Sequence, residues 1–251
     1  LELGGEDYKE MAEGDGHIKT GSVRRLIAGE PIGVFYGYRF DGIFQNEEEC
    51  KQQTSSASPI GVGLRRYKDL NGDGKVDAAN DREILGDANP KFFGGLTNTF
   101  AYKGFELNVF LQYSYGNKIL NYNAMELENP TGGQNAYADM VNRWTPENPS
   151  NIYPKATTNR AILASDRFIE DGSYLKLKTL SLSYSFPKIN MKHIQGLRLY
   201  VTGQNLLTWT KYRGYDPEVS YRGASTLEAG EDFGGYPQSR TFMFGVKLDI
   251  K

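Results

Sequence analysis

The chain has 251 residues, with 29 basic and 31 acidic side chains and a formal net charge of −2. This balance argues against a basic nucleic-acid-binding surface, so no nucleic-acid partner is expected. The single cysteine, Cys50, excludes an internal disulfide, and no apolar run approaches the roughly 18–20 residues of a membrane helix. The abundance of Tyr, Phe and Gly is typical of aromatic strands separated by glycine turns, and it predicts an all-β fold.

Alternation of apolar and polar residues predicts the strands in chain order. Residues 20–27 and 33–44 are the first two candidates. The clearest alternation follows at 92–102, 105–115, 180–186, 197–209 and 242–250. In these segments Phe, Leu, Val and Tyr share one face, while Ser, Thr, Asn and Gln occupy the other, apart from Phe110, Tyr200 and Leu206. The pattern predicts six or seven antiparallel strands with one apolar and one polar face each.

The connections between these strands differ greatly in length. Lys103-Gly104 predicts a tight turn, whereas 46–90, 117–167 and 211–238 are long. Short turns at one end and long extracellular loops at the other are typical of an outer-membrane β-barrel, whose strands face lipid on one side and a wet lumen on the other. The residues expected to line that lumen include Gln112, Ser181, Ser183, Thr202 and Gln204.

The same alternation also fits a different class of protein. A β-sandwich packs the apolar faces of two sheets against each other, and its strands alternate in the same way. The alternative to the barrel is therefore a soluble, calcium-stabilised β-sandwich module that binds carbohydrate.

A series of motifs gives a more specific indication, because the pieces occur in one order over most of the chain. They resemble the C-terminal part of SusC/RagA-family TonB-linked outer-membrane receptors. The matching segments are 29–45 (GEPIGVFYGYRFDGIFQ), 69–77 (DLNGDGKVD), 86–95 (GDANPKFFGG), 143–149 (RWTPENP), 165–178 (SDRFIEDGSYLKLK), 203–212 (GQNLLTWTKY), 214–218 (GYDPE) and 237–242 (PQSRTF).

This resemblance implies an antiparallel transmembrane barrel of about 22 strands with a plug domain. It further implies import of oligosaccharides or peptides across the outer membrane of Bacteroidota, a SusD-like surface lipoprotein that acts as a lid, and energy delivered through TonB. Residues 1–251 match no plug or TonB box, so we expect them to be the C-terminal part of the barrel. Either the remaining barrel and the plug then belong to other polypeptide, or the chain is a fragment of a larger protein.

One loop motif predicts a metal ion. Asp69-Leu-Asn71-Gly-Asp73-Gly74-Lys75-Val-Asp77 has the ligand spacing of a calcium loop, with a backbone carbonyl at Lys75. The twelfth position is Asn80 instead of Glu, so Asp81 would have to supply the last carboxylate. The motif predicts a structural Ca²⁺ at 69–81 within the loop 46–90, and the alternative is an Asn/Asp/Gly turn without metal.

Aromatic side chains in the long loops are candidates for substrate contacts, since exposed rings stack on sugars or contact peptides. The alternative for each ring is packing between loops. The candidates are Trp144, Tyr153, Tyr212, Tyr215, Tyr221 and Tyr236.

The sequence does not predict an enzyme. Glu170-Asp171 and Glu231-Asp232 are neighbours in sequence, which does not favour the converging geometry of a glycosidase pair. Acidic residues around Cys50 are expected to raise the pKa of its thiol, which disfavours a nucleophilic role.

Overall fold

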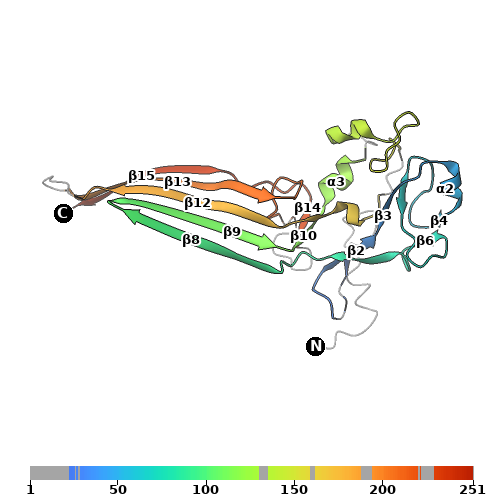
Figure 1. Cartoon of the computed structure of the whole chain (residues 1–251), viewed down its shortest axis with the longest axis horizontal. Coiled ribbons are helices and arrows are strands. Elements are labelled where there is room, and N and C mark those ends of the chain that lie inside the picture. The colour runs from blue at the N-terminus through green and yellow to red at the C-terminus, as the bar shows by residue number, and fades with distance from the viewer. Residues whose placement is uncertain are drawn as a thin grey trace. The chain divides into compact units, whose positions relative to one another are not determined.

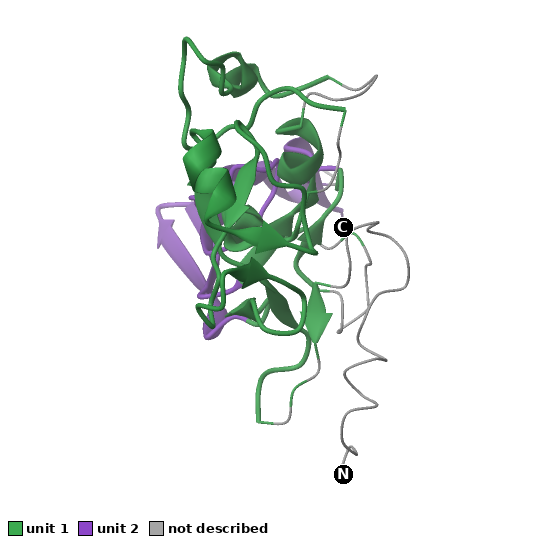
Figure 2. Ribbon diagram, turned by 90° about the vertical axis from the view of Figure 1, so that its right-hand side faces the viewer, with its two compact units in different colours: residues 1–89, 118–171, 218–235 green, residues 90–117, 172–217, 236–251 purple. Residues whose placement is uncertain are grey.

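The computed structural model divides into two compact units, which Figure 2 shows in separate colours. The structure describes residues 23–25, 27, 29–129, 135–158, 162–187, 194–219, 221 and 229–250. Unit 1 comprises residues 1–89, 118–171 and 218–235, and unit 2 comprises residues 90–117, 172–217 and 236–251. No helix among the described residues is long and apolar enough to cross a membrane.

Unit 2 is a single antiparallel sheet of five strands in the order β15-β13-β12-β9-β8 (Figure 1). The strands are β8 (Phe92–Tyr102), β9 (Phe105–Tyr115), β12 (Tyr174–Ser185), β13 (Ile194–Thr210) and β15 (Thr241–Ile250). The predicted tight turn between β8 and β9 is confirmed, because Lys103 and Gly104 both have positive φ angles of 45° and 88°.

The strand register confirms the two predicted faces of the sheet. Leu182 lies opposite Leu107 and Val201, whereas Ser181 lies opposite Asn108 and Thr202. Residues directly opposite each other share a face, so apolar and polar side chains segregate across neighbouring strands.

A β-bulge preserves this segregation where the sequence changes parity. Leu175 and Leu177 are odd-numbered, while Leu180 and Leu182 are even-numbered, and strict alternation would put the two pairs on opposite faces. The register shifts between Leu177 and Thr179 against both neighbouring strands, which keeps all four leucines on the apolar face.

The aromatic exceptions to the alternation are explained by glycines on the adjacent strand. Phe110 and Tyr200 both lie on the polar face. A Cβ atom at Gly95 would lie 2.6 Å from the Phe110 ring, and a Cβ atom at Gly245 would overlap the Tyr200 ring. Each ring therefore covers a position where the neighbouring strand has no side chain.

The apolar face of the sheet is exposed in the described chain. Phe100 on β8 and Phe244 on β15 expose 61% and 81% of their surface. A contiguous apolar band on long, two-faced strands is the pattern of a lipid-facing barrel wall. Exposure along this face does not fit the β-sandwich alternative, whose two sheets bury their apolar faces against each other.

Unit 1 has short strands and short helices around its own core. Its sheets are β1-β2-β7, β11-β10-β14, β3-β5 and β4-β6. The strands are β1 (Arg24–Arg25), β2 (Val34–Tyr38), β3 (Phe40–Ile43), β4 (Thr54–Ser55), β5 (Arg65–Tyr67), β6 (Lys75–Val76), β7 (Arg82–Gly86), β10 (Lys118–Asn121), β11 (Ile169–Asp171) and β14 (Glu231–Asp232). The helices are α2 (Glu47–Lys51), α3 (Tyr122–Leu127), η1 (Ala138–Asn142) and η2 (Asp166–Phe168).

The structure corrects the prediction that residues 33–44 form a barrel strand. This segment forms β2 and β3 in unit 1, with both faces of β2 largely buried. Its aromatic residues mimic an alternating strand, but Phe35 belongs to the core of the unit instead of to an outward apolar face. Of the candidate strand 20–27, the described residues contain only the two-residue strand β1; residues 20–22 and 26 lie outside the described residues.

Two of the three predicted long loops, 46–90 and 117–167, contribute residues to the buried clusters of unit 1. Leu120 and Phe168 come from different parts of the chain but pack in the same buried cluster, and neither is measurably exposed. Tyr67, Val76 and Leu163 form a second cluster with Tyr38. These two connections are therefore folded against each other within unit 1.

We expect neighbouring residues on β12 to meet different solvents in the complete receptor. In a Cys50→Ser background, Ser181→Cys should react with a small, membrane-impermeant thiol reagent on the order of tenfold faster than Leu182→Cys, because a thiol in lipid stays protonated. Labelling rates in intact outer membranes measure the difference. Equal rates at the two positions would contradict the assignment of the two faces.

Candidate functional site

The polar face of the five-stranded sheet is a continuous hydrogen-bonding surface. The Ser181 and Thr202 hydroxyl groups are 2.7 Å apart, joining β12 to β13. Arg198 donates to Glu106 Oε1 at 2.6 Å and to Ser183 Oγ at 2.7 Å. The register puts Gln112 and Gln204 on the same face as these groups. The predicted lumen residues are thus brought together on one polar face that is suited to contact water or a hydrophilic ligand.

A buried ion pair stands near the start of β12 on this face. Lys176 Nζ lies 2.5 Å from Asp216 Oδ1, and both side chains are at most 10% exposed. Asp216 Oδ2 also accepts the Gln238 backbone N–H at 3.3 Å. The pair links β12 to two connecting segments, although the sequence alone gave no sign that these two charges meet.

Two of the six candidate aromatic rings are buried, which corrects their assignment as substrate contacts. Trp144 and Tyr212 are only 9% and 5% exposed, so neither has a ring face open for stacking. The Tyr212 ring packs against Gly214, where a Cβ atom would overlap it. These two residues follow the alternative reading of loop packing.

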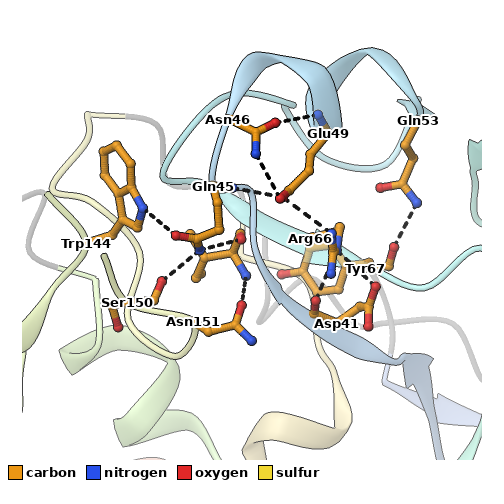
Figure 3. A network of polar contacts seen from close by, with 11 residues as sticks. Asp41, Gln45, Asn46, Glu49, Gln53, Arg66, Tyr67, Trp144, Ser150 and Asn151 are labelled. Atoms are coloured by element: carbon orange, nitrogen blue, oxygen red, sulfur yellow. Dashed lines mark hydrogen bonds and ion pairs between the residues drawn. The ribbon is translucent and has the colours of Figure 1, made fainter. Parts of the chain in front are cut away.

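Trp144 has a structural role that Figure 3 makes visible. Its indole Nε1 donates to Gln45 Oε1 at 3.0 Å, and Gln45 Nε2 donates to the backbone carbonyl groups of Ile43 and Ser150. The Asn151 side chain accepts the Ile43 N–H. Trp144 therefore anchors residues 143–151 to the segment that follows β3.

The other four rings are more accessible. Tyr153 is half-buried, donates its hydroxyl to Asp139 at 3.3 Å and lies 5.2 Å from the Arg167 guanidinium. Burial and the Asp139 carboxylate raise the pKa of Tyr153. Tyr215, Tyr221 and Tyr236 expose 79%, 50% and 93% of their surface. These three remain the candidate loop contacts with accessible rings.

The predicted calcium loop folds as a series of side-chain-capped turns. Asp69 accepts the N–H groups of Gly72 and Gly74, at 2.7 and 2.6 Å. Asp73 accepts the Lys75 N–H at 2.8 Å, and Gly72 and Gly74 supply the positive φ angles that the turns require. Among the described residues no three His, Cys, Asp or Glu side chains converge as a metal site. Calcium at Asp69, Asn71, Asp73, Lys75 and Asp77 stays a prediction.

Asp81 does not fit the role of a late calcium ligand. It is completely buried, and its carboxylate accepts the Leu70 and Asp77 N–H groups, both at 2.7 Å. Asp81 thereby ties the two ends of the loop together through its bonds to the backbone. The Asn80 N–H and the Lys75 ammonium lower the pKa of Asp77, so this carboxylate stays ionised into the acid range.

The acidic pairs and the cysteine show no catalytic arrangement. Asn121 donates to Glu170 at 3.0 Å, and Arg24 pairs with Glu231 at 2.9 Å, so both glutamates serve the packing of unit 1. Burial, followed by Glu47 and Glu49, raises the pKa of Cys50, as the acidic neighbours predict.

Sequence reasoning missed a buried charge cluster in unit 1. Arg167 lies 2.7 Å from the buried Glu128 carboxylate, and Arg65 donates to the Glu128 backbone carbonyl at 3.1 Å. Burial lowers the pKa of Arg65. Nothing in the local sequence brings these three residues together, because they come from segments 63 and 39 positions apart.

Curated relatives cover nearly the whole chain. The chain is 39% identical over 239 residues to TonB-dependent receptor P3 of Formosa agariphila, which covers 93% of this chain and 24% of that protein. It is 33% identical over 255 residues to TonB-dependent receptor P26 of the same organism, and 28% identical over 258 residues to TonB-dependent receptor SusC of Bacteroides thetaiotaomicron, covering 99% and 98% of this chain. The chain spans about a quarter of the length of these relatives. They are receptors and not enzymes.

The fold is also that of a solved transporter. The structure of the RagAB peptide transporter matches 92% of this chain and 25% of that chain, with a TM-score of 0.70 and 23% identity. The RagAB peptide importer in its closed-closed state matches 90% of this chain and 25% of that chain, with a TM-score of 0.67 and 22% identity. No protein-family model matches the chain.

Substitution of two aspartates in the 69–81 loop should distinguish an effect on metal binding from an effect on the closure of the loop. In the complete receptor, Ca²⁺ should raise the melting temperature of unit 1. Asp73→Ala should abolish this increase, because it removes a predicted calcium ligand. Asp81→Ala should lower the baseline melting temperature and keep the increment, because it breaks two backbone contacts. Melts with and without chelator measure both effects. Identical melts of the parent and Asp73→Ala under both conditions argue against calcium.

The ion pair of β12 should be a large contributor to the stability of unit 2. Asp216→Ala removes the carboxylate beside the buried Lys176 ammonium and should cost about 3–5 kcal/mol of unfolding free energy. Asp249→Ala is the control, since its partner Lys247 is 3.9 Å away and both side chains are exposed. Urea unfolding in lipid vesicles measures both variants. A loss no larger for Asp216→Ala than for the control would refute the assigned contribution.

Proposed function

Because this chain belongs to the SusC/RagA family of TonB-dependent receptors, we propose that it forms part of the barrel wall and loop region of an outer-membrane nutrient importer. The complete receptor imports oligosaccharides or peptides in a TonB-dependent manner. Its work is binding and gated passage, without covalent chemistry.

The two-faced sheet is the observation that carries this proposal. Its apolar face fits acyl chains, and its opposite face offers hydroxyl, amide and paired charged groups to a hydrated path. A soluble binding module has no use for a sheet whose apolar side is left open over five long strands.

Exposed rings of the connecting segments support a role in capture; Tyr221 lies in unit 1, whereas Tyr215 and Tyr236 lie in unit 2. A preformed core and the Trp144 anchor give unit 1 a defined surface, and such a surface lowers the entropy lost on binding. We assign Tyr215, Tyr221 and Tyr236 to contacts with substrate or with a SusD-like lipoprotein lid, since their rings are exposed. The relatives SusC and RagAB favour this class of partner.

The test uses the complete receptor in its own outer membrane. A strain without the receptor should lose growth on one class of oligosaccharide or peptide, and complementation should restore growth only when TonB is present. A Tyr215→Ala/Tyr221→Ala/Tyr236→Ala variant should reduce uptake several-fold at unchanged abundance, because aromatic contacts contribute about 0.5–1.5 kcal/mol each.

Tyr102→Ala is the matched control for the loop variant. Tyr102 is 70% exposed, but it lies on the apolar face beside the short turn. Affinity-tagged receptor should also co-purify with a surface lipoprotein. Growth that is the same with and without the receptor on every oligosaccharide and peptide tested would refute the importer function.

A further inference from the structure

Lys176 is a buried lysine on the polar face of the sheet. The register puts it opposite Gln112 on β9 and Thr208 on β13, so its side chain leaves the sheet on the same side as these polar groups. A lysine on a hydrated face normally extends its ammonium group into water, yet the Lys176 side chain is only 3% exposed. Polypeptide outside this chain could only reduce that exposure further. Part of this chain must therefore lie over the polar face at Lys176.

Two stretches of unit 2 supply this cover, and together we call them the strap: residues 211–217 after β13 and residues 236–240 before β15. Asp216 Oδ1 lies 2.5 Å from Lys176 Nζ, and Asp216 Oδ2 accepts the Gln238 N–H at 3.3 Å. One buried carboxylate thus ties the first stretch both to β12 and to the second stretch.

The second stretch of the strap also contacts the strands directly. Lys178 Nζ on β12 donates to Gln238 Oε1 at 3.4 Å, and Asn205 Nδ2 on β13 donates to the Ser239 carbonyl at 3.0 Å. β13 continues past Asn205 as far as Thr210. The strap therefore crosses the sheet within the length of the strands, and not beyond their ends.

The local sequence of the strap restricts its conformation. A Cβ atom at Gly214 would overlap the Tyr212 ring, so the first stretch folds tightly on itself. Pro217 directly follows Asp216, and Pro237 directly precedes the other tied residue. A proline limits the backbone of its own position and of the residue before it. These features favour a fixed strap over a freely moving loop.

We propose that the strap is a constriction of the import path at the extracellular end of the barrel wall, and that the Lys176–Asp216 ion pair holds it in place. The inference rests on the proposed import function, in which the polar face borders the path. The long connections lie at this end of the strands, and the short turn at Lys103-Gly104 lies at the other end. The strap limits the size of the molecules that pass, and Lys176 is a positioning residue, not a contact for cargo.

Thiol labelling from outside tests the constriction in the complete receptor in intact cells. The reference receptor carries Ser181→Cys in a Cys50→Ser background, which puts one thiol on the polar face, further along β12 than Lys176 and towards the short turn. Two membrane-impermeant maleimides are compared, one small and one with a polyethylene glycol chain. We expect the small reagent to react and the large reagent to be excluded.

Release of the strap should admit the large reagent. Lys176→Ala/Asp216→Ala removes the ion pair without leaving an unpaired buried charge. The ratio of the large-reagent rate to the small-reagent rate should rise on the order of tenfold, because it follows the fraction of receptors with a displaced strap. Asn205→Gly is a second release variant, since glycine accepts the φ angle of 53° and removes the amide contact with Ser239. It should raise the ratio as well.

Two variants should keep the reference ratio. Lys176→Arg retains a cation beside Asp216. Lys247→Ala/Asp249→Ala is the matched control, because this exposed pair lies on the same face near the opposite end of the sheet, with its charged atoms 3.9 Å apart. Receptor abundance and melting temperatures identify the variants that fold.

Each contrary outcome overturns a defined part of the inference. An unchanged ratio in a folded Lys176→Ala/Asp216→Ala receptor overturns the constriction; where that receptor does not fold, an unchanged ratio in Asn205→Gly does so. An equal rise in the Lys247→Ala/Asp249→Ala control also overturns it, and an equal rise in Lys176→Arg overturns the role of the ion pair. These results leave the import function standing. If the small reagent labels Ser181→Cys in no receptor, the polar face borders no hydrated path, and the proposed import function fails with the strap.

Discussion

The main constraint on unit 2 is that each strand must satisfy two solvents at once. A strand in a barrel wall turns alternate side chains to lipid and to water, so a shift of one residue would exchange the whole set. β12 meets this constraint with the bulge between Leu177 and Thr179, and Asn205 on β13, with a φ angle of 53°, lies where the partner strand adjusts. The bulge is therefore necessary for the leucines on both sides of it to share the apolar face.

In unit 1 the constraint is different, because long connecting segments must be held in a fixed conformation. Residues of two connections pack together, so that Tyr67 and Val76 of 46–90 are buried with Leu163 of 117–167. Charged groups are then buried with them, and the Glu128 carboxylate is matched by Arg167. Breaking such a pair leaves an uncompensated charge, so the pairing specifies how the loops meet.

The sequence predicted the strands of unit 2 because period-2 alternation is a local signal. Phe105 to Tyr115 shows this clearly, and the register pairs it as expected. The same signal failed at 33–44, where aromatic residues alternate inside a compact core. It also could not separate the buried Trp144 from the exposed Tyr236, since burial depends on which distant segment, here Gln45, arrives beside the ring. Family resemblance supplied the order of the motifs but no such contacts.

Two aromatic residues on the polar face, Phe110 and Tyr200, are explained by packing. Tyr200 covers Gly245, and Phe110 covers Gly95, so each ring fills space that the neighbouring strand leaves empty. This structural reason is sufficient for both, and it requires no ligand. Phe93 lies opposite Ser114 on the edge strand β8 and keeps 75% of its surface exposed in the described chain.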